Sequence, residues 1–136
     1  MPRVELHATI GDLLEKASAP TAEIAHHYLL GASAGTSLQA ARFAHRAAAE
    51  AEELADFAGA VRLIDAGLEA LDLGPDAPVV RIEMLIDRAQ TLKFLGEAVE
   101  SQQSSMQAFE LATEAGELDL AIVAAIVYIG MPRIDR

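Results

Sequence analysis

The chain has 136 residues, of which 28 are alanine and none is cysteine, and its 21 acidic and 10 basic residues give a net charge of −11. This length suits one domain with a core of several helices, and the absence of cysteine excludes disulfides and thiolate metal sites. The negative charge disfavours direct binding to DNA or RNA, because that binding depends on phosphate neutralisation.

Membrane insertion and secretion are not expected either. Charged residues interrupt every apolar run before it reaches the length of about 18 residues that a spanning helix needs, and the first residues lack the apolar stretch of a signal peptide. We therefore expect a cytoplasmic protein.

The N-terminal half shows helical spacing of apolar residues. A first helix is predicted over residues 3–17, and a second runs from Thr21 to the turn-forming segment Gly31–Gly35. Thr36 and Gln39 have the spacing of a capping box, in which the Thr36 hydroxyl accepts from the amide of residue 39 at the start of a third helix.

A fourth helix follows Asp56, which is expected to cap its N-terminus. Leu73-Gly74-Pro75 ends this helix, with Gly74 expected in the left-handed conformation after the last turn. A fifth helix opens at Asp76 or Ala77 and ends at Gly96.

The sixth helix is predicted from Val99 to Gly116, and a seventh begins near Leu118. No alternating apolar run bounded by a hairpin turn indicates a strand. The predicted fold is all-α, with about seven helices in antiparallel pairs that stack as a right-handed superhelix. The boundaries expected within a single domain, 1–136, are helix pairs at 3–33, 36–72 and 80–115 and a last helix at 117–129.

The second and third helix pairs read as two copies of one unit. A shift of 41 residues places Ala48 on Ala89 and Leu54 on Leu95, and it also aligns two further pairs on the second helix of each copy. Stacked repeats of this kind present a surface rather than a reaction centre.

The two copies resemble tetratricopeptide repeats, whose pattern places small residues where the two helices of a repeat meet. Ala48, Ala60 and Gly67 fill these positions in the first copy. In the second copy Ser101 and Ser105 stand where an alanine and an aromatic residue are expected, and the offset exceeds the usual length of about 34 residues.

The whole chain is similar to the helical-repeat region of large bacterial regulators that join a STAND-class ATPase to an output domain, many of them LuxR-family transcriptional regulators. The similar segments are Arg3–His7, Glu23–Leu30 and Ala108–Ala112. The resemblance implies a relay or scaffold role. It carries over neither ATP hydrolysis nor promoter binding, because the sites for both lie outside the similar region.

In a tetratricopeptide stack the first helix of each pair lines a concave groove. This geometry predicts a mixed polar groove that takes a peptide or a helix of another domain. Its expected lining is Arg42, His45, Ala49 and Glu52 from the first copy and Glu83, Ile86, Gln90 and Lys93 from the second. The alternative is a short array whose groove is not used.

The segment Leu120–Ile129 is apolar on nearly every side. Such a helix is normally buried on more than one side, and a large exposed apolar face marks an interface. We therefore predict self-association, as a homodimer, through residues near Ile122, Ile126 and Ile129.

Other polar groups do not form a recognisable reaction centre. Adjacent helical residues such as His26 and His27 point about 100° apart and cannot chelate one metal ion together; one ring is expected at a helix interface and the other in solvent. Gly31–Ser37 lacks the lysine and the preceding strand of a phosphate loop. The serines at 101, 104 and 105 have no identifiable base, so nucleophilic catalysis is not expected.

The sequence therefore predicts a non-catalytic protein–protein interaction or signal-relay module without cofactor or metal. The alternative is a small-ligand sensor with a pocket between helices near His26, Tyr28 and Arg42. An enzyme is the weakest hypothesis, because no acid, base and nucleophile converge in the sequence.

Overall fold

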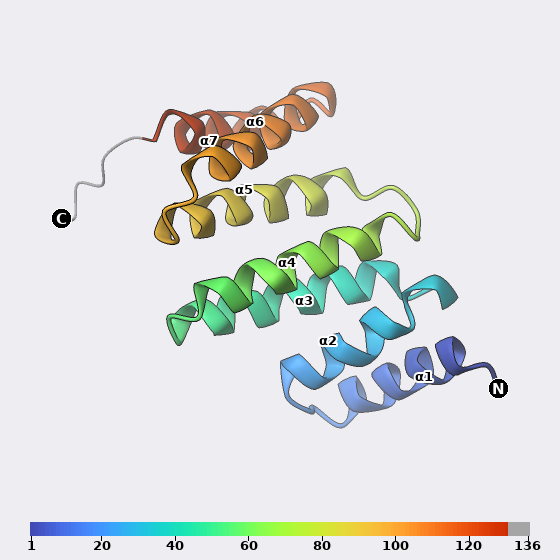
Figure 1. Ribbon diagram of the computed structural model, residues 1–136. Helices are drawn as coiled ribbons and strands as arrows, with labels where there is room; N and C mark the ends of the chain where they lie inside the picture. The colour runs from blue at the N-terminus through green and yellow to red at the C-terminus, as the bar shows by residue number, and fades with distance from the viewer. Residues whose placement is uncertain (131–136) are drawn as a thin grey trace. The chain divides into compact units, whose positions relative to one another are not determined.

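The computed structural model of the protein describes residues 1–130, and all regular elements in that range are helical (Figure 1). The predicted all-α class and the predicted number of helices are confirmed. In chain order the elements are α1 (Arg3–Lys16), α2 (Thr21–Leu30), the 3₁₀ helix η1 (Ala32–Ala34), α3 (Ser37–Glu53), α4 (Phe57–Leu71), α5 (Pro78–Phe94), α6 (Ala98–Glu114) and α7 (Leu118–Ile129).

The chain divides into two compact units, Met1–Ala77 and Pro78–Arg136, with the boundary between the second and third predicted helix pairs. In the first unit α1 packs against α2, α2 against α3, and α3 against α4. In the second unit α5 packs against α6, and α7 packs against both of them. The right-handed superhelical stack remains a prediction.

The same turn ends four of the helices. After α1, α3, α5 and α6 one residue adopts a positive φ: 54° at Ser18, 59° at Ala55, 78° at Gly96 and 73° at Gly116. In each turn the amide of this residue bonds to the carbonyl three residues back, and the next amide bonds to the carbonyl five residues back. This double bond pattern is the Schellman motif, and it satisfies carbonyls that the helix end leaves free.

A reciprocal pair of substitutions tests the cost of these turns. Ala55 is exposed and carries a side chain in a conformation that favours glycine, so Ala55→Gly is expected to raise the free energy of unfolding by about 0.5–1 kcal/mol. Gly96→Ala is expected to lower it by about 1 kcal/mol, since an added Cβ meets no atom within 4 Å and only the backbone strain changes. Urea denaturation of both variants measures the difference, and equal signs for the two changes would contradict it.

The predicted cap of α4 is confirmed. Asp56 Oδ1 accepts from the amide of Gly59 at 2.9 Å. A Cβ on Gly59 would collide with the Asp56 carboxylate, so the glycine provides the space for this cap.

Two other helix-end predictions are wrong, because a contact between helices takes the place of the local one. The Thr36 side chain does not cap α3; its Oγ1 donates instead to the Tyr28 carbonyl at 3.0 Å, which ties the start of α3 to α2. Gly74 is not left-handed, and its role is steric: a Cβ there would collide with the Ser37 hydroxyl.

Alanine dominates the buried positions, as its abundance suggests. In the first unit the buried cluster joins α2, η1, α3 and the end of α4, with Tyr28 and Phe43 as its large members. In the second unit α5 supplies most of the larger buried residues, including Ile82 and Met84, while α6 and α7 supply alanines, serines and Val127. Small residues allow the helix axes to approach closely. Among residues 1–130 no helix has both the length and the apolar character to cross a membrane.

Candidate interaction surface

Helix α7 buries two alanines and one valine and exposes its larger apolar residues. Its buried positions are Ala121, Ala124 and Val127, which pack toward α5 and α6. The exposed large apolar side chains of the same helix are Leu118, Ile122, Val123, Ile126, Tyr128 and Ile129. A helix with this distribution has a second apolar side that its own unit does not cover.

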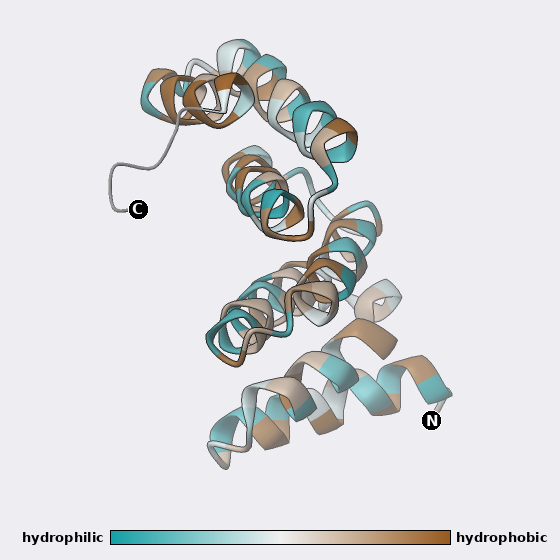
Figure 2. Ribbon diagram, turned by 60° about the vertical axis from the view of Figure 1, so that its left-hand side comes forward, coloured by the Kyte–Doolittle hydropathy of each residue, from teal (hydrophilic) through white to brown (hydrophobic). Residues whose placement is uncertain are grey.

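The three residues predicted to mediate self-association share one face of α7. Ile122, Ile126 and Ile129 follow the i, i+4, i+7 spacing of a single helical stripe, and they are 59%, 45% and 71% exposed. Figure 2 shows α7 as a mainly brown helix next to the grey C-terminal trace. The exposure places an uncharged apolar stripe at the surface, while the self-association itself stays a prediction.

Two hollows between α6 and α7 lie beside this stripe, and side chains of both helices line them. An apolar hollow of about 190 Å³ is lined by Met106 and Phe109 of α6 and by Ala125, Tyr128 and Ile129 of α7. Here we name Met106, Phe109, Ile122, Ile126, Tyr128 and Ile129 the α6–α7 surface.

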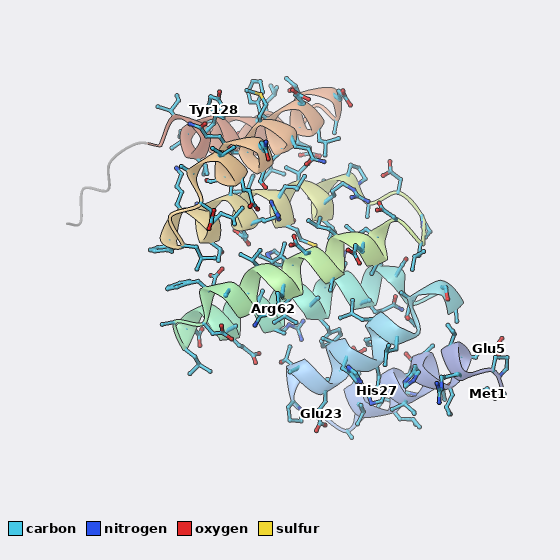
Figure 3. All side chains as sticks on the ribbon, viewed as in Figure 1. Met1, Glu5, Glu23, His27, Arg62 and Tyr128 are labelled. Carbon is cyan, nitrogen blue, oxygen red and sulfur yellow. The ribbon has the colours of Figure 1, made fainter. Side chains whose placement is uncertain are left out.

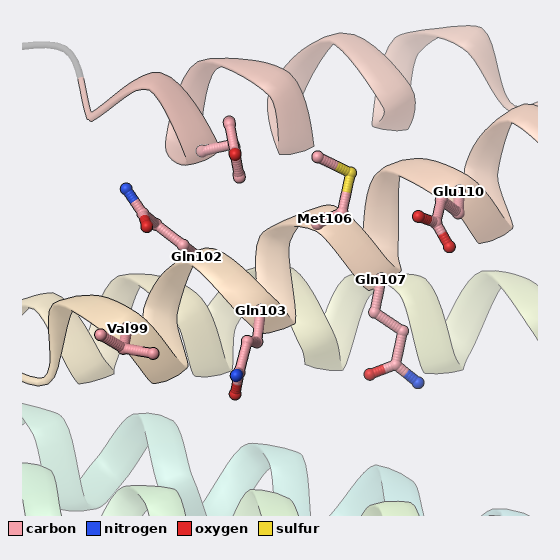
Figure 4. A pocket seen from close by; sticks show the side chains of 7 residues that line it. Val99, Gln102, Gln103, Met106, Gln107 and Glu110 are labelled. Carbon is pink, nitrogen blue, oxygen red and sulfur yellow. The ribbon is translucent and has the colours of Figure 1, made fainter.

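The second hollow, of about 430 Å³, has a mixed lining of three glutamines and Glu110 beside Val99, Met106 and Tyr128. Figure 4 shows Gln102 and Met106 extending from α6 toward α7. Tyr128, labelled in Figure 3, lines both hollows and is shared by the apolar and the mixed one. Sequence reasoning did not single out Tyr128, because its role depends on which residues of α6 lie opposite.

Lys93 fixes the C-terminal end of α7. Its Nζ donates to the carbonyl of Val127, one of the last carbonyls of the helix, and Gly130 then ends α7 with a φ of 70°. A cation at a helix C-terminus satisfies free carbonyls and complements the helix dipole. Lys93 was expected to line the groove, which stays a prediction, and its bond to Val127 connects α5 to the end of α7.

The other groove residues lie on two helices of different units. Arg42, His45, Ala49 and Glu52 share one face of α3, while Glu83 and Gln90 are exposed on α5 and Ile86 is 5% exposed. His45 and Glu52 each already have an interaction. A groove that combines both helices stays a prediction.

The small-ligand pocket expected near His26, Tyr28 and Arg42 stays a prediction, and the structure describes the surroundings of two of these residues. Tyr28 is 1% exposed, and its hydroxyl lies 2.8 Å from Asp12 Oδ1 and 2.6 Å from Glu15 Oε1. Burial and these two carboxylates raise the pKa of Tyr28, so its phenol stays protonated. Arg42 lines a separate hollow that neither His26 nor Tyr28 lines.

The adjacent histidines separate as expected, with His26 exposed and His27 half-buried between α1 and α2. His27 faces a residue that sequence reasoning missed: its Nδ1 lies 2.9 Å from His7 Nδ1, and the two rings stack. His7 and His27 are separated from the turn at Ser18 by similar numbers of residues. In an antiparallel helix pair such positions lie opposite each other, so this spacing could have indicated the contact. In residues 1–130 no group of three His, Cys, Asp or Glu side chains is placed to hold a metal ion.

The pair makes stability depend on pH. Burial, then His26 and His7, lowers the pKa of His27 below its ordinary value of 6.5, against the opposing charge of Glu23. The folded chain therefore binds fewer protons than the unfolded chain below that value. We expect the free energy of unfolding to be constant above about pH 6.5 and to fall as the pH drops from there toward about 5.

Urea denaturation of the wild type and of His27→Gln across this range measures the effect. The slope is expected to flatten in His27→Gln, because the group that titrates at this position is removed. An unchanged slope in His27→Gln would assign the pH dependence to other groups.

The serines of α6 take part in helix packing. Ser101 Oγ donates to the Ala89 carbonyl at 2.7 Å, and Ser104 Oγ accepts from Arg88 Nη1 at 2.6 Å. Both serines are buried, and Arg88 also lies 3.6 Å from Glu100. These bonds connect α5 to α6 and use the hydroxyls that a nucleophile would need.

Comparisons of the chain with protein families, with curated proteins and with solved structures found no match.

Proposed function

We propose that the chain is a non-catalytic helical-repeat module that binds protein through the α6–α7 surface, and that a second copy of the chain is the occupant. The observation that carries the proposal is α7, which places alanines against its own unit and isoleucines outside. In a repeat array this position is where a following element packs. A second copy supplies that element.

The negative charge of the chain restricts where a second copy can contact it, and the α7 face satisfies this restriction. Two chains of net charge −11 repel each other, so their contact must avoid the acidic faces. No residue from Leu120 to Ile129 is charged, and the helix is apolar along its length. A twofold contact of α7 with its copy brings the same apolar stripe together from both sides.

Light scattering across a concentration series tests the proposal. The wild type is expected to be a dimer at tens of micromolar, and Ile126→Glu is expected to be a monomer, because it buries a charge in the contact. Higher salt is expected to strengthen the dimer by screening the repulsion between the two negative chains.

Leu54→Glu is the matched control. Leu54 is 83% exposed at the end of α3 and receives the same change of charge outside the α6–α7 surface. A dimer that persists in Leu54→Glu and dissociates in Ile126→Glu supports the assignment. A wild type that stays monomeric over the series contradicts it, as does an equal effect of the two variants.

We further propose that the module is a tetratricopeptide-like relay element of a cytoplasmic bacterial regulator of the LuxR or STAND type. The support is the similarity of the segments Arg3–His7, Glu23–Leu30 and Ala108–Ala112 together with the Schellman turn that recurs between helices. The coding sequence on either side tests this proposal. An in-frame ATPase or DNA-binding domain supports it, and stop codons at both ends contradict it.

A further inference from the structure

The first unit contains a hollow of about 470 Å³ at the turn between α1 and α2, beside α3. Its volume lies in the range of small-molecule sites. All its lining residues belong to this unit: Glu15, Ser18, Ala19, Thr21, Ile24, Gln39, Arg42, Phe43 and Arg46.

Two guanidinium groups line one wall. Arg42 and Arg46 are four residues apart on α3, so they stand one above the other on the same helix face. Both are exposed, and within residues 1–130 neither forms an ion pair with a carboxylate. Two adjacent cations that form no ion pair are notable in a chain with 21 acidic and 10 basic residues, and the one carboxylate that also lines the hollow is Glu15.

The floor of the hollow is apolar and includes an aromatic ring. The Arg46 guanidinium carbon lies 4.6 Å from the centre of the Phe43 ring, and this stacking orients the guanidinium at the edge of the hollow. Phe43 is 8% exposed and packs on Tyr28, with ring centres 5.6 Å apart. Ile24 completes the apolar part of the lining.

The opposite wall offers hydrogen-bond acceptors and donors. Glu15 is held in place by the Tyr28 hydroxyl at 2.6 Å, which leaves its other oxygen open to accept a bond. Thr21, the first residue of α2, adds a hydroxyl at a helix N-terminus whose N-cap, Pro20, makes no side-chain bond. The walls thus place cations on one side and a fixed acceptor on the other.

We propose that this hollow binds a small organic anion, a carboxylate or a phosphate monoester with a flat apolar body. The anionic group pairs with Arg42 and Arg46, because guanidinium forks match the geometry of both anions. The apolar body contacts Ile24 and the part of the Phe43 ring that Arg46 and Tyr28 leave open, and a hydroxyl of the ligand donates to Glu15. The site belongs to the first unit and does not depend on the proposed dimer of α7.

Calorimetric titration with 4-hydroxyphenylacetate and with phenyl phosphate tests the site, with the alcohol 4-hydroxyphenylethanol as the neutral match. At least one anion is expected to bind with a Kd of about 1 mM or lower, and the neutral alcohol much more weakly. The stronger of the two anions identifies the carboxylate or the phosphate as the preferred group. Amide shifts of Thr21 and Gln39 in an NMR titration are expected to locate the binding.

Arg42→Gln and Arg46→Gln are each expected to weaken binding about tenfold, the effect of losing one charge-assisted contact. Arg62→Gln is the matched control, since Arg62 is an exposed arginine on α4 outside the hollow (Figure 3). Circular dichroism checks that these surface variants keep their helix content. No binding of either anion, equal binding of the neutral alcohol, or an equal loss in Arg62→Gln overturns the proposal.

Discussion

Gly31→Ala is expected to lower the free energy of unfolding by about 3 kcal/mol or more, because the added Cβ meets backbone that cannot move aside. A Cβ at this position would lie 2.5 Å from the Ala8 nitrogen and 2.8 Å from the Ala8 Cα. The φ of −96° is open to alanine, so the effect is steric. The clash separates α1 from the end of α2, and urea denaturation with amide hydrogen exchange of α1 measures the loss.

Two further variants distinguish this explanation from a general effect of substitution in the turn. Ser33→Ala changes an exposed residue of η1 and is expected to be neutral. Ala8→Gly removes the Ala8 Cβ, which lies 3.0 Å from the added atom, and leaves the closer backbone contacts. The double variant Ala8→Gly/Gly31→Ala is therefore expected to stay destabilised, and full recovery of stability would show that only side chains collide.

The positions of the helices could be predicted from the sequence, because residues close to each other in the chain determine them. Breaks at Pro20, Gly35, Gly74-Pro75, Gly96 and Gly116 separate most of the segments with helical apolar spacing, while α3 and α4 are divided at Ala55 without a glycine or proline. Asp56 caps α4 because its partner amide is only three residues away. Thr36 and Gly74 behave differently. The Thr36 hydroxyl bonds to Tyr28 of α2, and Gly74 leaves space for Ser37 of α3, and local spacing contains no information on these partners.

The sequence predicted the part of the candidate surface that depends on one helix alone. The uncharged segment Leu120–Ile129 predicts an exposed apolar face without information from other helices. In the structure Ile122, Ile126 and Ile129 are exposed on one face of α7. Tyr128 gains its role from the packing of α6 on α7 and Lys93 from the packing of α5 on α7, and the periodicity of one helix contains no information on either contact. The hollow at Arg42 similarly needs three segments to meet, and only Arg42 was a candidate from sequence.

Ser105→Phe is expected to lower the free energy of unfolding by about 3 kcal/mol, although the repeat pattern places an aromatic residue at this position. Ser105 is 0% exposed, and its hydroxyl bonds to the carbonyls of Ser101 and Gln102 in its own helix. α6 presents small residues, Ser101 and Ala108 among them, to its neighbours, so α5 and α6 pack closely. A phenyl ring at this buried site must push the two helices apart.

Ser105→Ala separates volume from hydrogen bonding. It removes bonds within one helix, whose carbonyls keep their backbone partners, and is expected to change the free energy of unfolding by less than about 1 kcal/mol. Ser101→Ala is expected to cost about 1 kcal/mol, because Ser101 bonds across to the Ala89 carbonyl of α5. If Ser105→Phe proves as stable as the wild type, the second pair has room for the repeat's aromatic residue, and the departure from the pattern is not a packing requirement.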